Sequence, residues 1–228
     1  MNNTQWMSFS SQIKNPNISA LISFRSFNDQ NKKDSELLAS QYGFIDKKLI
    51  IPKQIHSSKV LFTNKKGIIS NCDGTFSSEK KLICSIEVAD CMPIYFAHKF
   101  EIVYGLIHAG WRGLVNNIIL LSGELLVSNN YRLKDFDVII GPSIQNCCFE
   151  VKKDVIGQFD ETFIQKKITG EYAVDLQAYA TNHLLKSGFS QQNITQIKDC
   201  TYCMSDFYFS YRRNNENKSR MIGLIGIQ

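Results

Sequence analysis

The chain has 228 residues, a formal net charge of +5, 43% hydrophobic residues and 21% charged residues. This length suffices for a sizeable core in one domain or two tightly packed halves, and the composition is ordinary for a globular protein. The lysine and arginine pairs are scattered along the chain, which argues against nucleic acid as a partner. No apolar run approaches the roughly 18 residues of a membrane span, so we expect no membrane partner.

The N-terminal segment MNNTQWMSFSSQIKN has no basic stretch followed by an apolar one. We therefore expect no secretory signal peptide and a cytoplasmic location. Thiols stay reduced in that compartment. The seven cysteines are then expected to be packing residues, metal ligands or nucleophiles rather than disulfides.

Short runs rich in β-branched and aromatic residues predict strands along most of the chain. The predicted strands are Ile18–Phe24, Leu49–Ile51, Val60–Thr63, Leu82–Ile86, Ile94–Ala97, Ile102–Ile107, Val138–Ile140, Ile194–Lys198 and Met221–Ile227. The sequence AHKFE between two of these runs predicts a hairpin, so part of the sheet should be antiparallel.

Fewer segments have the pattern of a helix. Ser35–Tyr42 predicts a helix that stops at Gly43, and leucines and isoleucines at helical spacing predict another over residues 114–125. Asp175 can cap a third helix, and a fourth is expected near Lys153–Phe159. Strands interleaved with a few helices predict a mixed α/β or α+β fold with helices covering the faces of a sheet.

Three segments place a reactive side chain beside the end of a predicted strand: KQIHSS with His56, EVADCMP with Cys91, and HAGWRGL with His108. Two imidazoles and one thiol form a three-ligand set for Zn²⁺ that leaves a fourth position open to water. The same atoms also permit a nucleophilic Cys91 thiolate with His108 as its general base. The spacing along the chain does not choose between these chemistries.

Other polar residues are candidates for binding a substrate. Asp73 either makes a turn with Gly74 or serves the site, and Arg25, Arg212 and Arg213 either recognise an anion or brace a loop. The aromatic run that contains Phe207, Tyr208 and Phe209 can stack on a planar base, although such runs more often belong to the core.

The remaining histidines and cysteines have plainer interpretations. We expect His183 to pack on one helix face and His98 to be a solvated turn residue. Cys200 and Cys203 form a C-x-x-C pair that Cys147 and Cys148 can complete to a four-thiolate structural zinc site. The alternative is that these four are ordinary packing thiols. No partner is evident for Cys72 or Cys84.

Taken in order, these segments resemble the YfiH-like family, whose members are variously labelled multicopper polyphenol oxidase (laccase), peptidoglycan editing factor and purine nucleoside phosphorylase. The resemblance runs from about residue 18 to the C-terminus, and its most specific part is ADC-x-P followed by HAGWRG. The matching motifs are QIHSSKV, CDGTFSS, VADCMPIYF, HAGWRGL, GPSIQNCCFEV, CTYC and FYFSYRR…SRMIGLIG.

The resemblance implies a single α/β domain over residues 1–228, a mixed-sheet sandwich with helices on the sheet faces that is distantly similar to a cysteine-hydrolase toxin. It also implies that His56, Cys91 and His108 bind one catalytic metal, usually zinc. The implied activities are phosphorolysis of adenosine, inosine, guanosine and methylthioadenosine, and hydrolytic deamination of adenosine. A purine nucleoside and phosphate are the implied partners, and Arg25, Asp73, Arg112 and Arg213 are the expected substrate-binding residues.

The chain departs from the family pattern in two places. The segment FRSFNDQNKKDSELL is short and lacks the usual Gly-Gly and histidine, and Ser57 replaces the usual glycine after His56. We still expect His56 to reach the metal. The alternatives are a Cys91-dependent amidohydrolase that edits a peptidoglycan precursor, a copper-dependent phenol oxidase and a non-enzymatic binding module. Four histidines are too few for a type 1 copper and a trinuclear cluster.

Overall fold

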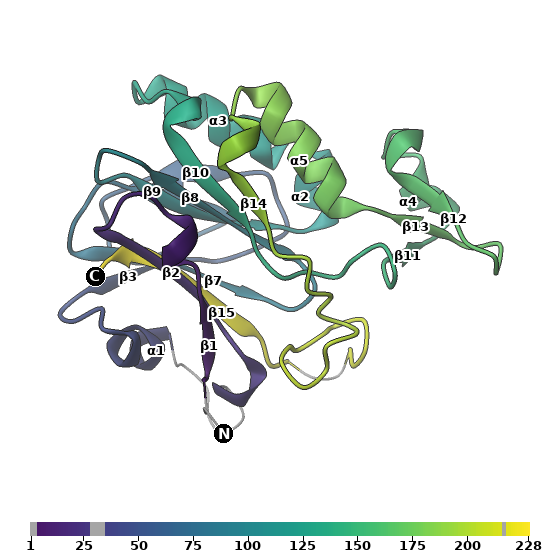
Figure 1. The fold of residues 1–228 in the computed structure, drawn as a ribbon, viewed down its shortest axis with the longest axis horizontal. Helices are drawn as coiled ribbons and strands as arrows, with labels where there is room; N and C mark the ends of the chain where they lie inside the picture. Colours follow the sequence, from purple (N-terminus) through teal and green to yellow (C-terminus); the bar gives the residue numbers. More distant parts are fainter. Residues whose placement is uncertain (1–3, 28–34, 216–217) are drawn as a thin grey trace.

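Two six-stranded mixed sheets lie face to face at the centre of a computed structural model that describes residues 4–27, 35–215 and 218–228 (Figure 1). The first sheet has the order β1 (Trp6–Ser8), β2 (Ile18–Ser23), β15 (Met221–Ile227), β7 (Leu82–Val88), β3 (Lys48–Pro52) and β5 (Gly67–Ile69). The second has the order β14 (Ile194–Gln196), β10 (Phe136–Ile140), β8 (Met92–His98), β9 (Tyr104–Ala109), β6 (Gly74–Ser77) and β4 (Val60–Phe62).

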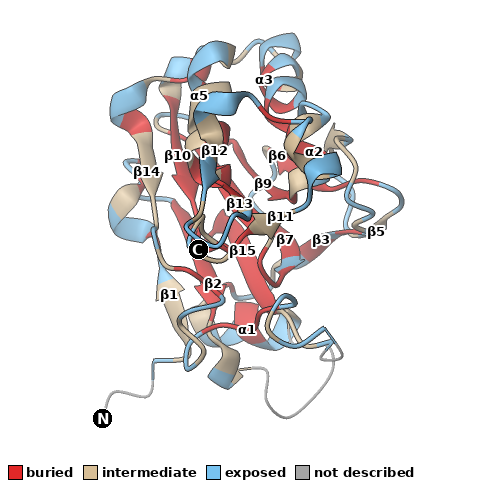
Figure 2. Ribbon diagram, turned by 90° about the vertical axis from the view of Figure 1, so that its right-hand side faces the viewer, coloured by how far each residue is buried: buried red, intermediate tan, exposed pale blue. Residues whose placement is uncertain are grey.

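Alternating side chains of these strands divide the core into three apolar layers. Between the sheets, Ile22, Ile86 and Ile225 of the first sheet pack against residues such as Tyr95 and Leu106 of the second. The opposite face of the first sheet is covered by α1 (Ser35–Tyr42). The outer face of the second sheet is covered by α3 (Ile118–Ser128) and α5 (Leu176–Ser187). Buried strands therefore run through the middle of the molecule beneath more exposed helices (Figure 2).

A small sheet of β11 (Glu150–Val151), β13 (Tyr172–Val174) and β12 (Ile164–Lys166) stands at one side with the short helix α4 (Lys153–Ile156) (Figure 1). Single 3₁₀ turns occur at Ser10–Gln12, Arg25–Phe27, Leu133–Asp135, Glu161–Phe163 and Gln191–Asn193. None of the helices in the described ranges is both long and apolar enough to cross a membrane. The architecture confirms the predicted mixed α/β fold.

The expected helix starts and stops are confirmed at α1 and α5. Gly43 follows α1 at a φ of 103°, which a residue with a side chain rarely adopts. Asp175 caps α5, because its Oδ1 accepts a hydrogen bond of 2.8 Å from the Ala178 backbone N–H.

The helix expected over residues 114–125 is instead two helices, α2 (Trp111–Val115) and α3. Asn117 between them has a left-handed backbone, with a φ of 64°. The apolar periodicity continues across this break and therefore gives no sign of it. The helix expected near Lys153–Phe159 is limited to α4.

The hairpin is confirmed, since β8 and β9 pair antiparallel, but the prediction that His98 is solvated is wrong. His98 is 3% exposed, packs edge-on against Phe136, and its Nδ1 accepts the Glu101 backbone N–H at 3.0 Å. The hairpin loop folds back over the ring and buries it. His183 packs as expected, stacked on Tyr179 with ring centroids 4.2 Å apart.

Candidate metal-binding active site

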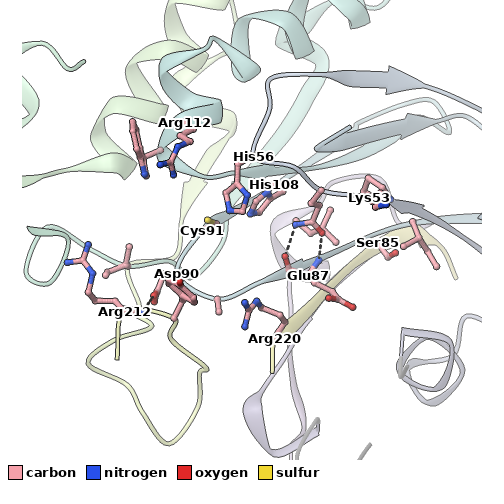
Figure 3. Close-up of a pocket in the computed structure, with 18 of the residues that line it drawn as sticks. Lys53, His56, Ser85, Glu87, Asp90, Cys91, His108, Arg112, Arg212 and Arg220 are labelled. Atoms are coloured by element: carbon pink, nitrogen blue, oxygen red, sulfur yellow. Dashed lines mark hydrogen bonds between the residues drawn. The ribbon is translucent and has the colours of Figure 1, made fainter. Parts of the chain in front are cut away.

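The three predicted ligands meet because of the register of the second sheet. The β8–β9 pairing sets Pro93 opposite His108, so Cys91, just before β8, lies beside the end of β9. His56 comes from the loop after β3 and has a φ of 59°. One donor atom from each of His56, Cys91 and His108 can be chosen so that all three lie within 4.8 Å of one another. Figure 3 shows the three side chains converging from separate segments of the chain.

A buried carboxylate fixes His108 through its ring and His56 through its backbone. Asp73 Oδ1 pairs with His108 Nδ1 at 2.9 Å and accepts the His56 backbone N–H at 2.9 Å. Its Oδ2 accepts the Ser57 backbone N–H and Ser57 Oγ–H at 2.7 Å each, and the Ile55 N–H at 3.2 Å. Asp73 immediately precedes β6, where Gly74 pairs with Ile107, so the sheet itself brings it next to His108. Pairing through Nδ1 leaves His108 Nε2 to face a metal, and metal-binding histidines commonly donate their other ring N–H to a carboxylate in this way.

The charges at this site are strongly coupled. Burial opposes the ionised form of Asp73, but hydrogen bonds from His108 and Ser57 outweigh it and lower the pKa of Asp73 to about 2. Burial also disfavours protonated His108, yet the charge of Cys91 and the bond to Asp73 raise the His108 pKa to about 9. Burial would raise the pKa of Cys91, but His108 and His56 lower it to about 6. Without a metal, the group favours a thiolate beside an imidazolium.

Gly110 leaves room for the ligands. A Cβ atom at this position would lie 3.0 Å from Cys91 Sγ and 3.2 Å from a ring carbon of His56. Its φ of −71° is open to any residue, so the glycine is needed for space rather than for a tight turn. Gly113 has a similar role, since a Cβ there would lie 3.0 Å from the Ser57 carbonyl oxygen.

The three candidate ligands lie in a pocket of about 770 Å³ between the ends of β3, β7 and β9 and the segment before β15. Its cationic and aromatic lining residues are Lys53, Arg112, Arg212, Arg220, Trp111, Phe149 and Tyr211. Each arginine lies over one of these rings, with centroid distances of 4.4 Å for Arg112, 5.6 Å for Arg212 and 5.9 Å for Arg220. The pocket therefore offers positive charge and flat apolar surfaces near the candidate metal ligands (Figure 3).

Of the four expected substrate-binding residues, the structure places Arg112 in the pocket wall. Asp73 is fully buried behind the histidines. Arg25 donates to the Ser205 carbonyl oxygen, and Arg213 donates to those of Thr201, Tyr202 and Tyr208. None of these three lines the pocket. Arg25 and Arg213 brace the segment after β14, and Asp73 orients the ligands.

The sequence analysis left Arg220 out of the site and chose Arg213 over Arg212 as the substrate-binding arginine, whereas Arg212 is the one that lines the pocket. The pair in FYFSYRR signalled Arg212, but only the structure turns Arg212 to the pocket and Arg213 inward. Asp90 holds this segment in place through three hydrogen bonds. It accepts Thr201 Oγ1–H at 2.7 Å, Ser210 Oγ–H at 3.0 Å and the Arg212 backbone N–H at 2.7 Å. Of the aromatic run, Tyr208 and Phe209 are buried in the core between the sheets, whereas Phe207 is 46% exposed.

The loop departure expected in FRSFNDQNKKDSELL falls partly on residues 28–34, outside the described residues. The second departure has a clear consequence. Ser57 adds a hydroxyl bond to Asp73 that glycine lacks, so the loop carrying His56 is held more firmly.

Comparisons with known proteins show the family and agree with this fold. The family model described as multi-copper polyphenol oxidoreductase laccase matches residues 23–228. A purine nucleoside phosphorylase of Borreliella burgdorferi is 32% identical over 198 residues, covering 83% of this chain and 85% of the relative. One from Staphylococcus saprophyticus is 30% identical over 211 residues, covering 85% and 79%.

Solved structures give the same result for the fold. The crystal structure of YlmD from Geobacillus stearothermophilus superposes with a TM-score of 0.91 at 22% identity, covering 100% of this chain and 98% of that one. YfiH of Bacillus licheniformis superposes with a TM-score of 0.88 at 19% identity, again covering 100% and 98%.

The fold and site together define a mixed α/β sandwich protein with a candidate His-Cys-His metal site in an arginine-lined pocket. The chain belongs to the YfiH-like family, the multi-copper polyphenol oxidoreductase laccase family of the matching model.

Proposed function

We propose that this chain is a single catalytic domain that acts on purine nucleosides with zinc as its cofactor. The proposed reactions are phosphorolysis of adenosine, inosine, guanosine and methylthioadenosine, and hydrolytic deamination of adenosine. The observation that carries the proposal is the convergence of His56, Cys91 and His108 in a pocket lined by three arginines. The names of the relatives support the substrate class.

The donor set fits zinc. Two imidazoles and one thiolate are typical ligands of a zinc site with an open position. The Asp73 carboxylate orients the His108 ring through Nδ1, and the low Cys91 pKa favours the thiolate that a metal binds. When bound, zinc would act as a Lewis acid and lower the pKa of a coordinated water to about 7.

A multicopper centre fits these residues less well. His98 packs on Phe136 and His183 on Tyr179, so neither joins the two histidines of the candidate site. The chain has four histidines in total, which leaves too few imidazoles for a type 1 copper and a trinuclear cluster.

The pocket walls match the parts of a nucleoside and a phosphate. A volume of about 770 Å³ lies within the usual range for a small-molecule site. Trp111, Phe149 and Tyr211 offer ring faces to a purine. Arg112 can bind phosphate through paired N–H groups, and Arg212 can bind it through the N–H groups other than Nη1, which donates to the Cys148 and Glu150 carbonyl oxygens. The phosphate would attack C1′ of the ribose as the bond from C1′ to the base breaks.

Proton transfer requires a side chain that is not already committed. Both Asp90 oxygens are engaged by Thr201, Ser210 and Arg212, whereas Glu87 lines the pocket with an exposed side chain. Glu87 is therefore the carboxylate that we expect to move a proton during deamination.

The test is metal analysis combined with two product assays on the purified chain. We expect one zinc per chain at this site, phosphate-dependent release of purine base from inosine, and ammonia release from adenosine. His108→Ala should lose this metal and both activities, whereas His183→Ala, on α5, should keep them. Protein with zinc bound here that leaves adenosine, inosine, guanosine and methylthioadenosine unchanged, with and without phosphate, would contradict the proposal.

A second candidate is a thiol hydrolase, such as an amidase that edits a peptidoglycan precursor. It is favoured by the Cys91–His108–Asp73 array, in which a low-pKa thiol faces an imidazole held by a carboxylate. This function requires activity that survives chelation and a Cys91 that iodoacetamide blocks in the resting enzyme. If chelation abolishes activity and zinc protects Cys91 from alkylation, the thiol mechanism is excluded.

A further inference from the structure

Four of the seven cysteines form a second group that the proposed reactions do not use. Cys147 and Cys148 lie in the loop between β10 and β11, and Cys200 and Cys203 lie in the turn after β14. Although 52 residues separate Cys148 from Cys200, the four sulfur atoms all lie within 4.8 Å of one another. None of the four lines the pocket of the candidate active site.

The sulfur positions suit one tetrahedral metal ion. Zn–S bonds of about 2.3 Å place tetrahedral ligands about 3.8 Å apart. Cys203 Sγ lies 3.7 Å from Cys147 Sγ and 3.3 Å from Cys148 Sγ, and no pair exceeds 4.8 Å. Shifts of about 1 Å or less would therefore allow all four sulfurs to bind the same ion.

The backbone prepares Cys200 to be a thiolate ligand. The Gln145 N–H lies 3.5 Å from Cys200 Sγ, and the backbone N–H groups of Tyr202 and Cys203 are directed at the same sulfur. Backbone N–H groups that converge on a sulfur stabilise its negative charge and fix its orientation. Within C-x-x-C, these two donors in the turn lie two and three residues after Cys200.

Positive charge lies beside the opposite loop. Lys167 Nζ donates to the Cys147 carbonyl oxygen at 2.7 Å, and Arg212 Nη1 donates to the Cys148 carbonyl oxygen at 3.2 Å. Four thiolates around a divalent ion carry a net charge of −2, which Arg212 offsets in part, whereas Lys167 is also paired with the Glu150 carboxylate at 2.5 Å.

Packing does not account for this group. Cys200 is 7% exposed, but Cys147 and Cys203 are exposed to solvent, an unusual position for free cysteines. The loops that carry them belong to different elements and meet at these side chains. A ligand shared by all four sulfurs explains both the exposure and the convergence.

We propose that Cys147, Cys148, Cys200 and Cys203 bind a second Zn²⁺, as a structural site. The ion would tie the β10–β11 loop to the segment after β14, which carries Arg212 into the active-site pocket. It would therefore stabilise one wall of the pocket without contacting substrate.

The test is to strip the reduced protein with a chelator and titrate it with zinc. We expect the wild type to bind two equivalents of zinc. The single variants Cys203→Ser, Cys148→Ser and His108→Ala should each bind one equivalent. The double variant that combines Cys203→Ser with His108→Ala should bind none. Cys84→Ala, at a buried thiol outside both groups, should keep two. Co²⁺ bound to His108→Ala should show the ligand-field spectrum of a tetrathiolate, and this spectrum should be absent after Cys203→Ser.

Two results would overturn the proposal. In the first, the wild type binds a single equivalent of zinc, His108→Ala binds none, and the four clustered cysteines are alkylated equally fast with and without zinc. The other is a metal-free cluster whose intact mass shows the loss of two hydrogen atoms, because two of the sulfurs have formed a disulfide. Neither measurement uses catalytic activity, so the second site is tested separately from the proposed function.

Discussion

Asp73 shows how much a single buried carboxylate can organise. Its two oxygens accept three backbone N–H groups and one hydroxyl from the His56 loop and pair with His108 Nδ1. Hydrogen bonds to the ionised form lower its pKa to about 2, from an ordinary value of 3.8. The folded state therefore gains stability that is fully present above about pH 4 and is lost as the pH falls toward 2.

Asp73→Asn should lower the free energy of unfolding by ~3 kcal/mol at pH 7, because the amide leaves buried donors facing its own NH₂ group. The variant should also lack the loss of stability between about pH 4 and 2 that Asp73 causes in the wild type, and should bind zinc about 10–100-fold more weakly. Urea unfolding at several pH values and zinc titration measure these effects. Asp206→Asn, at an exposed carboxylate, is the control. Equal stability of Asp73→Asn and wild type would contradict this role.

Cys91 should react as a thiolate once the metal is removed. Its pKa of about 6 implies that alkylation by iodoacetamide accelerates as the pH rises through 6 and levels off by about pH 7. His108→Ala removes the facing positive charge, so the midpoint should move up toward the ordinary value of about 8.5. Labelling rates followed by mass spectrometry measure both curves. A wild-type midpoint above pH 8 would show that His108 does not activate this thiol.

At the scale of elements, the junction between β9 and α2 is built around the space beside Gly110. The strand ends with His108 and Ala109, and the helix begins at Trp111, which carries the ring under Arg112. Cys91 and His56 fill the volume that a side chain at residue 110 would need.

Gly110→Ala should therefore weaken zinc binding and cost about 1–3 kcal/mol of stability, since the new methyl group displaces Cys91 or His56. The backbone φ of −71° accepts alanine, so the far-ultraviolet circular dichroism should not change. Gly157→Ala is the matched control, because a Cβ there meets nothing within 4 Å. If Gly110→Ala binds zinc as tightly as the wild type, the ligands do not require this space.

At the scale of the whole molecule, the two sheets are joined by a mostly apolar layer that contains few polar links. Tyr95 of β8 is fully buried between them, and its hydroxyl donates to the Leu21 carbonyl oxygen of β2 at 2.9 Å. Gly223 of β15 leaves room for that hydroxyl, since a Cβ would lie 2.7 Å from it.

Tyr95→Phe should lower the free energy of unfolding by about 0.5–1.5 kcal/mol, the usual net effect of one buried hydrogen bond. Zinc binding should not change, because the site lies at the ends of the strands and not between the sheets. Tyr131→Phe is the control, since its hydroxyl has no hydrogen-bond partner among the described residues. Thermal and urea unfolding measure the difference in stability. A loss of zinc affinity in Tyr95→Phe would show that the core between the sheets and the candidate zinc site are not independent.

Local sequence indicated the candidate reactive side chains and most of the central elements. The apolar runs predicted nine of the strands, the caps at Gly43 and Asp175 marked helix ends, and His56, Cys91 and His108 stood out beside strand ends. These features depend on near neighbours along the chain, where side-chain alternation and capping act. The short strands of the side sheet lacked such a pattern.

Tertiary structure decided which residues share a site. Pairing of β6, β8 and β9 brings Asp73, Cys91 and His108 together, and the loop after β3 adds His56. The same long-range contacts bury His98, turn Arg212 to the pocket and Arg213 away from it, and gather four cysteines from two loops. Burial and distance between remote residues depend on sheet register and layer packing, which no local stretch of sequence contains.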